Sequence, residues 1–312
     1  AGGGTAGHIN PALAVAGYIR ERHPDATISF IGTAEKLESR LVPEAGYDFY
    51  TIDVAGFQRK LNFQNVKRNL SALRKVFVSS SQAKHLLRSL QPDVVMGTGG
   101  YVSGPVLREA AKMGFKTVIH EQNAFPGVTT KMLAPKVDKV MLAMPEAKQY
   151  LKLKAEPIVT GNPVREAVIH ADRKTARKAL GLDDRPFILS FGGSLGARPI
   201  NESVAALMAW HWKEGKYYHY HAAGKAGFDT MKALLKEKGV KLDKAPAIRM
   251  TEYINDMDLC MAAADLCICR AGAITLSELQ VQGKASILIP SPYVAENHQY
   301  HNAMTLKNKG AA

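Results

Sequence analysis

Short apolar runs alternate with longer amphipathic segments along the whole chain, and the alternation forms two successive series. The short runs have the length of strands, whereas the longer segments, about ten to twenty residues each, have the periodicity of helices. Strands joined by crossover helices build a parallel sheet, so the pattern predicts an α/β fold of two doubly wound domains in tandem. The expected strands are residues 27–31, 49–52, 93–96, 117–120, 139–142 and 158–159 in the first series, and 187–191, 217–221, 247–249, 266–269 and 286–289 in the second.

The boundary between the two domains is expected at Gly161-Asn162-Pro163, a turn-rich tripeptide that follows a short strand. We therefore predict one domain over residues 1–160 and a second over residues 161–312. A length of 312 residues is sufficient for two domains of ordinary size. Because the chain opens on a glycine loop that ought to follow a strand, we expect the first strand of the N-terminal domain to be missing.

The charge balance raises the question of a polyanionic partner, because 41 Lys and Arg face 28 Asp and Glu and leave a net charge of +13. No acidic residue lies between Asp53 and Asp93. Apolar and basic residues interleave there, which predicts an amphipathic segment on an anionic membrane surface, or a helix that buries its apolar side in its own domain. The basic residues are Arg59, Lys60, Lys67, Arg68, Arg74, Lys75, Lys84 and Arg88, and the apolar ones are Phe57, Leu61, Phe63, Val66, Leu70, Leu73, Val76 and Phe77. Stacking motifs with interleaved aromatics are absent from the sequence, so nucleic acid is not an expected partner.

Other features favour a cytoplasmic protein without a membrane-spanning helix. No apolar run approaches the 18 residues that such a helix needs, and no export signal opens the chain. The three cysteines, Cys260, Cys267 and Cys269, lie close together in an otherwise Cys-free chain. Without a second ligand pair they do not form a zinc motif, and we expect buried free thiols.

Two glycine loops are candidates for ligand binding. Gly2-x-Gly4-x-x-Gly7 has the spacing of a dinucleotide fingerprint, although the expected ribose-binding acid is not at a strand tip. The second loop, residues 192–197, follows a predicted strand and opens a helix. One loop in each half suggests two binding lobes, which fits the transfer of a group from a donor to an acceptor better than hydride transfer.

In the second half, the segment Arg270–Glu278 runs from a strand end into a helix, where small residues let a diphosphate approach backbone donors. Glu278 can accept hydrogen bonds from ribose hydroxyls, or it can simply pair with the dipole of the helix start. Gln299 and Asn302 stand three apart on the last predicted helix, where their amides either contact sugar hydroxyls or face solvent.

In the first half, the loops at residues 97–105 and 120–127 each follow a predicted strand, at the sheet edge where open α/β sheets bind ligands. The polar residues expected along one wall of this site are His8, Tyr101, His120, Glu121 and Asn123. His8 follows the first glycine loop directly and is our candidate for a general base.

Taken together and in this order, these loops resemble the MurG family, inverting glycosyltransferases that move N-acetylglucosamine from UDP-GlcNAc to undecaprenyl-pyrophosphoryl-muramyl-pentapeptide in peptidoglycan synthesis. The resemblance covers nearly the whole chain. The matching segments are residues 3–8 and 10–14, 99–105, 120–123, 161–165, 192–197, 251–254, 270–278 and 298–303.

The resemblance implies the GT-B fold, two Rossmann-like domains facing across a cleft, with the lipid acceptor bound by the N-terminal domain and UDP-GlcNAc by the C-terminal one. The implied donor contacts are Ile254 for uracil, Glu278 for ribose, Arg165, Ser194, Ala273, Ile274 and Thr275 for the diphosphate, and His298 and Gln299 for the sugar. The implied acceptor contacts are Thr5, Gly7, Tyr101 and Asn123, and the implied catalytic residues are His8 and Glu121. Relative to the family, the chain has His298 where Gln is usual and Ala6 where Gly is usual, and it lacks the first strand and the closing helix.

The expected reaction is a direct displacement at the anomeric carbon with inversion, which requires neither a metal nor another cofactor. The resemblance also implies a peripheral place on the cytoplasmic face of the cell membrane and a role in cell-wall growth, cell shape and division. Three alternatives stay open at this point: a nicotinamide-dependent dehydrogenase, a UDP-GlcNAc epimerase of the same fold, and a basic membrane-binding protein that is not an enzyme.

Overall fold

The structure is a computed structural model that describes residues 1–54, 63–193 and 195–312, and for residues 63–76 it describes the backbone alone. The chain divides into two compact units, Ala1–Pro163 and Val164–Ala312, and the boundary directly follows the tripeptide Gly161-Asn162-Pro163 where we expected the join. Every strand pair in both units is parallel. The predicted strands are all present, with ends within two residues of those expected, because buried parallel strands are nearly continuous apolar runs.

The described residues of unit 1 form two parallel sheets. The smaller pairs β1 with β2, and the larger has the order β3-β4-β5-β6. Ala1 lies beside β3, since its amino nitrogen donates to Met96 O at 2.6 Å and its oxygen accepts the Thr98 N–H at 3.0 Å. The glycine loop that follows Ala1 therefore begins at the sheet edge where β3 ends. The strands are β1 (Ser29–Gly32), β2 (Asp48–Thr51), β3 (Val94–Gly97), β4 (Lys116–Glu121), β5 (Lys139–Leu142) and β6 (Ile158–Val159).

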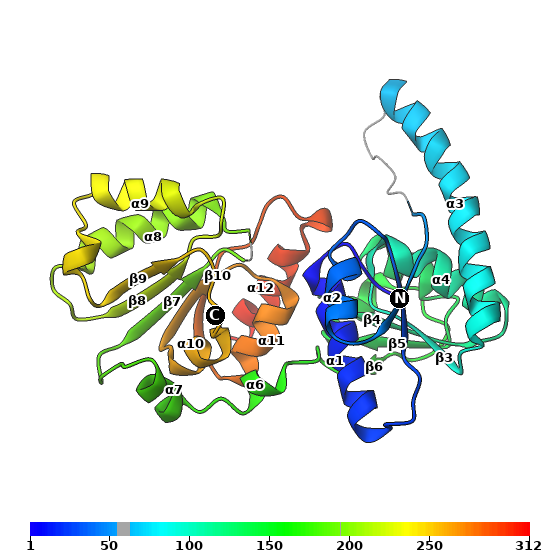
Figure 1. Ribbon diagram of the computed structural model, residues 1–312, viewed down its shortest axis with the longest axis horizontal. Helices are drawn as coiled ribbons and strands as arrows, with labels where there is room; N and C mark the ends of the chain where they lie inside the picture. Colours follow the sequence, from blue (N-terminus) through cyan, green and yellow to red (C-terminus); the bar gives the residue numbers. More distant parts are fainter. Residues whose placement is uncertain (55–62, 194) are drawn as a thin grey trace. The chain divides into compact units, whose positions relative to one another are not determined.

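The helices of unit 1 bury two apolar clusters. One lies between α3, α4 and the larger sheet, around the fully buried Leu87, Leu107 and Ile119. The other lies between α1, α2 and the smaller sheet. Figure 1 shows the first part of α3 extending away from the rest of this unit. The helices are α1 (Ala6–Arg22), α2 (Glu38–Glu44), α3 (Phe63–Leu90), α4 (Gly100–Lys112), α5 (Val128–Leu133) and the 3-10 helix η1 (Pro145–Tyr150).

Unit 2 has one five-stranded sheet with the order β11-β10-β7-β8-β9. The chain starts in the middle at β7, moves outward to β9, and then returns to the other side through β10 and β11. The strand order therefore reverses between β7 and β10, and ligands of open α/β sheets bind at the carboxyl ends of such a strand pair. The strands are β7 (Phe187–Phe191), β8 (Tyr218–Ala222), β9 (Ile248–Thr251), β10 (Leu266–Cys269) and β11 (Ala285–Leu288).

Helices cover both faces of this sheet. In Figure 1, α8 and α9 lie over one face, and α7 and α10 lie over the other. The helices of unit 2 are α6 (Glu166–Ile169), α7 (Arg173–Ala179), α8 (Arg198–His211), α9 (Phe228–Glu237), α10 (Met257–Ala263), α11 (Ala273–Val281) and α12 (His298–Asn308), with the 3-10 helices η2 (Leu242–Lys244) and η3 (Ala295–Asn297).

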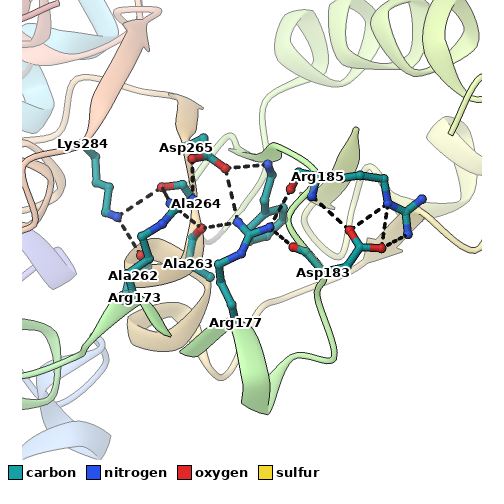
Figure 2. A network of polar contacts seen from close by, with 10 residues as sticks. Arg173, Arg177, Asp183, Arg185, Ala262, Ala263, Ala264, Asp265 and Lys284 are labelled. Atoms are coloured by element: carbon teal, nitrogen blue, oxygen red, sulfur yellow. Dashed lines mark hydrogen bonds and ion pairs between the residues drawn. The ribbon is translucent and has the colours of Figure 1, made fainter. Parts of the chain in front are cut away.

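A network of ion pairs fixes α7 and α10 against the sheet (Figure 2). Asp265 accepts hydrogen bonds from the Phe187 N–H at 2.8 Å and pairs with Arg173 at 2.7 Å and Arg177 at 3.3 Å. The carbonyls of residues 262–264 at the end of α10, which have no acceptor role inside the helix, receive Arg173, Arg177 and Lys284. The network thus satisfies the carbonyl groups at the end of α10. It also pairs the largely buried guanidinium of Arg177 with the carboxylate of Asp265.

The cysteines have the predicted environment. All three are buried free thiols, and burial raises the pKa of Cys260 and of Cys267 to about 12, so these thiols are inert. Within the described residues, no group of three or more His, Cys, Asp or Glu side chains is placed to hold a metal ion. No helix in the described part of the chain combines the length and hydropathy needed to cross a bilayer.

Candidate functional site

In unit 1, the first glycine loop and the loop after β3 are in backbone contact. A Cβ at Gly100 would lie 2.3 Å from Gly3 O, and a Cβ at Gly2 would lie 2.2 Å from Thr98 Oγ1. Gly99 and Gly100 have φ of +105° and +76°, a region that favours glycine. These positions leave no room for a side chain, so the two loops form one continuous backbone surface at the sheet edge.

A buried carboxylate that the sequence analysis missed supports this surface. Glu38, only 1% exposed, accepts the Gly4 N–H at 2.9 Å through Oε2. Its Oε1 accepts the Thr33 hydroxyl at 2.8 Å and the Thr33 N–H at 3.2 Å. The one signal in the sequence is the Gly-Thr turn that precedes this acid. The Glu38 carboxylate therefore holds the glycine loop in place through the backbone of Gly4.

His8 lies in the first turn of α1 and is half-buried. Its Nδ1 is 3.0 Å from Thr98 O and 3.3 Å from Gln122 Oε1. Thr98 Oγ1 in turn donates to His8 O at 2.7 Å. The imidazole is thus held on one side, and its Nε2 has no hydrogen-bond partner among the residues that the structure describes.

The loop after β4 is organised by Glu121, which is 3% exposed. Oε1 accepts both the Asn123 N–H and the Asn123 amide at 3.1 Å, and Oε2 accepts the Gly127 N–H at 3.1 Å and the Thr130 hydroxyl at 2.5 Å. Donors from its own loop and from α5 therefore occupy both oxygens. This geometry is that of a carboxylate that orders the loop and thereby positions Asn123.

The other acceptor-side residues differ in exposure. Tyr101 at the start of α4 is 64% exposed, and Thr5 and Gly7 are exposed at the start of α1. His120, in contrast, is 3% exposed and does not line a wall as expected. Its Nε2 is 3.0 Å from Gly161 O, and burial lowers the pKa of His120, so the ring is neutral.

In unit 2, the described part of the loop after β7 packs against the backbone of the loop after β8. A Cβ at Gly196 would lie 2.1 Å from Ala223 O, and a Cβ at Gly224 would lie 2.4 Å from Gly196 N. Gly193 and Gly196 have φ of +93° and +76°. The loop therefore takes a conformation that only glycine adopts without strain. Ser194, the expected diphosphate contact, lies outside the described residues.

A chain of hydrogen bonds between buried side chains ends at the same Ala223 carbonyl. Its members in order are His211, His219, Ser190, His221 and Asn201, with successive distances of 3.2, 2.8, 2.8 and 3.1 Å, and Asn201 donates to Ala223 O at 2.9 Å. Burial lowers the pKa of all three histidines, that of His221 to about 4. The sequence analysis did not predict this chain, which joins two strands and a helix.

The segment after β10 begins α11, and Gly272 is its N-cap residue. Ala273, Ile274 and Thr275 form the first turn, at the end of a helix that attracts anionic groups. Arg270 donates to Ile289 O at 3.0 Å and thereby ties the end of β10 to that of β11.

Glu278 lies one turn further along α11 and pairs with Arg165, the N-cap residue of α6. The carboxylate oxygen Oε1 is 3.3 Å from Arg165 Nε and 3.2 Å from Nη2. Burial raises the pKa of Glu278, and the guanidinium of Arg165 opposes this shift. The structure thus brings together two residues that the sequence assigned to different parts of the donor.

The loop before α12 is strained, and one of the two amides of α12 that we expected to contact the sugar, Gln299, holds its backbone. Glu296 and Asn297 have φ of +56° and +50°, which is uncommon outside glycine. Gln299 Oε1 accepts the Ser291 N–H at 2.8 Å, and Asn302, fully buried, donates to Ala271 O at 3.2 Å. Asn302 therefore neither faces solvent nor reaches a sugar. The remaining donor-side candidates are His298, whose Nδ1 is 2.8 Å from Ala295 O, and Ile254, whose side chain is buried.

Comparisons with known proteins agree with this arrangement. The glycosyltransferase family 28 N-terminal domain matches residues 1–142, and the family's C-terminal domain matches residues 187–312. A protein of Acetivibrio thermocellus named UDP-N-acetylglucosamine--N-acetylmuramyl-(pentapeptide) pyrophosphoryl-undecaprenol N-acetylglucosamine transferase is 48% identical over 312 residues, which is 100% of this chain and 82% of that protein. The crystal structure of Acinetobacter baumannii MurG matches with a TM-score of 0.75 and 31% identity, over 99% of this chain and 82% of that one. UDP-GlcNAc 2-epimerase from Neisseria meningitidis, at 12% identity and a TM-score of 0.58 over 97% and 88% of the two chains, shares the fold alone.

Two parallel α/β units with glycine loops at the carboxyl ends of their strands define a glycosyltransferase of the GT-B fold. The chain belongs to glycosyltransferase family 28 and, within it, to the MurG family. The predicted fold class and the resemblance are therefore confirmed. None of these matches supports a nicotinamide-dependent dehydrogenase or a protein that is not an enzyme.

Proposed function

We propose that the chain transfers N-acetylglucosamine from UDP-GlcNAc to undecaprenyl-pyrophosphoryl-MurNAc-pentapeptide. The observation that carries this function is the 48% identity, along all 312 residues, to a relative whose name states that transfer. The product of this reaction is lipid II, so the chain acts in peptidoglycan synthesis. Roles in cell shape and division would follow from that place in wall growth.

Unit 2 is proposed to bind the donor at the carboxyl ends of β7 and β10. The first turn of α11, with Ala273, Ile274 and Thr275, would receive the diphosphate, because a helix N-terminus stabilises anionic groups. Glu278 would accept hydrogen bonds from the ribose, and the backbone at Ile254 would contact uracil. The other donor contacts proposed are Arg165 and Ser194 for the diphosphate and His298 and Gln299 for the sugar.

Unit 1 is proposed to bind the lipid-linked acceptor and to supply the base. His8 Nε2 would take the proton of the acceptor sugar hydroxyl, while the oxygen of that hydroxyl bonds to the anomeric carbon of GlcNAc. The bond from that carbon to the diphosphate breaks, UDP leaves with the electron pair, and the configuration inverts. Thr5, Gly7, Tyr101 and Asn123 would contact the acceptor. The four hydrogen bonds to Glu121 favour a positioning role for it.

Electrostatic stabilisation of the leaving diphosphate is proposed to come from Arg165 and from the backbone of the α11 turn, without a cofactor. Negative charge grows on the diphosphate in the transition state, and the positive end of a helix lowers its energy. The fixed backbone of the turn needs no reorganisation during the reaction.

The proposed location is peripheral, on the cytoplasmic face of the cell membrane. The acid-free stretch supports it, although residues 55–62 and the side chains of residues 63–76 lie outside the described part. In the described part of α3, Phe77 is 76% exposed and the next residue, Val78, is 37% exposed, so two adjacent apolar side chains lie on the surface. We propose that α3 around Phe77 contacts the anionic lipid surface on which the acceptor is presented.

A transfer assay tests the function directly. Radiolabelled UDP-GlcNAc is incubated with a short-chain analogue of the lipid acceptor, and label should appear in the lipid product only when both are present. A UDP-GlcNAc epimerase would instead convert the donor without an acceptor, and that result would overturn the proposal.

The same assay tests the base. His8→Ala should lower kcat about a hundredfold or more, as for loss of general base catalysis, while the KM for UDP-GlcNAc stays near its normal value. His85, exposed on α3, supplies the control His85→Ala, which should turn over normally. Near-normal turnover of His8→Ala would remove His8 from the reaction.

A further inference from the structure

We infer that Gln122 is a positioning residue, which sets the tautomer of His8 so that Nε2 carries the lone pair. The inference rests on the proposed role of His8 as the base. It concerns a buried amide, 2% exposed, to which the sequence analysis gave no role. The argument depends on which atoms donate and which accept in the contacts that join His8, Gln122 and His120.

The orientation of the Gln122 amide follows from its neighbours. Its Nε2 lies 2.9 Å from Thr98 O and 3.0 Å from His120 O. Carbonyl oxygens only accept hydrogen bonds, so the amide nitrogen must face them. The amide oxygen Oε1 consequently faces His8 Nδ1, at 3.3 Å.

His120 confirms this orientation independently. Its Nε2 is 3.0 Å from the carbonyl of Gly161, so Nε2 carries the proton of this neutral ring. Its Nδ1 is therefore an acceptor, and it lies 3.0 Å from Gln122 Nε2. A flipped amide would place an oxygen against this lone pair and against two carbonyl oxygens.

The tautomer of His8 follows from the same reasoning. Its Nδ1 faces two acceptors, Thr98 O at 3.0 Å and Gln122 Oε1, so in the neutral ring Nδ1 carries the hydrogen. The lone pair is then on Nε2, the atom that would accept the proton of the sugar hydroxyl. Gln122 also donates to the carbonyl of Thr98, so one amide orients both acceptors.

A neutral amide at this position differs from the carboxylate that orients histidine in serine hydrolases. A carboxylate stabilises the imidazolium form, whereas an amide oxygen accepts the Nδ1 hydrogen without adding a charge. The arrangement thus fixes the tautomer without placing a charge beside the imidazole.

The first test reads the tautomer by ¹⁵N NMR of the histidine rings, which distinguishes a protonated from an unprotonated ring nitrogen. The wild-type chain should show His8 protonated at Nδ1. In Gln122→Met, which keeps the side-chain length but removes both polar atoms, a measurable fraction should shift to protonation at Nε2. Thr98→Val is the matched control, since it removes a hydrogen bond to the backbone of His8 and leaves both acceptors of Nδ1 in place. An unchanged His8 tautomer in folded Gln122→Met would overturn the inference.

The second test separates positioning from mere structural support. Gln122→Glu keeps an oxygen acceptor for Nδ1, but its second carboxyl oxygen replaces the amide nitrogen and faces Thr98 O and His120 O. In its ionised form it also adds a charge, which favours the imidazolium. We expect the Nδ1 tautomer to persist while the acid limb of the kcat profile moves to higher pH. Gln122→Met should lose about tenfold in kcat with little change in the KM for UDP-GlcNAc. Equal losses in both variants with no movement of the acid limb would indicate support of the loop alone and refute the inference.

A failure of the inference about Gln122 can be distinguished from a failure of the proposed role of His8. If His8 is not the base, His8→Ala keeps its turnover and the acid limb, whatever the tautomer is. If Gln122→Met does not fold, as judged by its Tm, Gln122→Glu decides the matter through the tautomer and the acid limb together.

Discussion

Three buried glutamates differ in how many of their carboxylate oxygens have hydrogen-bond partners. Glu38 and Glu121 accept hydrogen bonds from N–H and O–H groups of neighbouring loops, so their charges are compensated and both oxygens are occupied. Glu278 differs, because Arg165 contacts only its Oε1 and its Oε2 has no partner within the described residues. A buried carboxylate with an unused oxygen is suited to accept hydroxyl groups from a ligand.

This difference predicts a graded effect at Glu278. Glu278→Gln should raise the KM for UDP-GlcNAc about tenfold, and Glu278→Ala by more, because Ala also leaves Arg165 without its partner. The measurement is the donor KM at saturating acceptor. Glu237→Gln, an exposed glutamate on α9, is the control. A KM equal to that of the wild type in both Glu278 variants would exclude Glu278 from the donor site.

At the scale of elements, two loops of unit 2 meet at backbone atoms near Gly196 and Gly224. The loop after β7 contacts the carbonyl of Ala223, and the hydrogen-bonded histidine chain ends at the same carbonyl through Asn201. We therefore expect the position of the glycine loop to depend both on close packing at this carbonyl and on the neutral histidines linked to it. Two predictions separate the steric and the electrostatic parts of this dependence.

The steric part is tested with two glycines of one loop. Gly193 and Gly196 both have positive φ, but a Cβ at Gly193 meets nothing within 4 Å, whereas one at Gly196 meets Ala223 O at 2.1 Å. Gly193→Ala should cost about 1 kcal/mol of unfolding free energy from backbone strain, and Gly196→Ala distinctly more. The two tryptophans of the chain, Trp210 and Trp212, both lie in unit 2, so their fluorescence during urea unfolding reports this unit. Equal losses would show that steric contact with Ala223 is unimportant.

The electrostatic part predicts acid sensitivity of unit 2. Below pH 6.5 the unfolded chain binds protons at His211, His219 and His221, whereas the folded chain, with lowered pKa values, does not bind them until about pH 4 for His221. The free energy of unfolding should therefore fall as pH falls from 6.5 towards 4, by at most about 1.4 kcal/mol per pH unit for each histidine.

The check is tryptophan-monitored urea unfolding at several pH values. His211→Phe should reduce the slope by one histidine's share, and the exposed His170→Gln should leave it unchanged. A stability that does not vary between pH 7 and pH 5 would contradict the neutral histidine chain.

At the scale of the whole molecule, the net charge of +13 is distributed over a chain whose acceptor is proposed to be a membrane lipid. Unit 1 contains the whole acid-free stretch, and the middle of α3 adds an exposed Phe77. Basic residues and exposed apolar residues together bind anionic bilayers, with a contribution that salt weakens.

We expect the chain to sediment with phosphatidylglycerol-containing vesicles at low salt and less so at high salt. Phe77→Ser should weaken this binding, because it removes an apolar contact. Trp210→Ser, which changes an equally exposed aromatic residue of unit 2, should not. Loss of binding in both variants, or in neither, would place the membrane contact elsewhere.

The strands, the two units and most loops could be predicted from the sequence, because they depend on local periodicity and on glycine spacing. Contacts between residues far apart along the chain could not be predicted. Glu38 meets Gly4 across 34 residues, and Gln122 meets His8 across 114 residues, so no local pattern links them. The burial of His120 was likewise mispredicted, since a polar residue at a strand end looks the same whether it faces a ligand or a distant carbonyl.

The hydrogen bond between His120 Nε2 and Gly161 O links an imidazole ring to the backbone at the boundary between the two units. Gly161 has a φ of +72° and directly precedes Asn162 and Pro163, the last residues of unit 1. A change in the ψ torsion of Gly161 turns its carbonyl away from His120 Nε2 and breaks this hydrogen bond. The ring-nitrogen resonance of His120 is therefore expected to report the backbone torsion of Gly161.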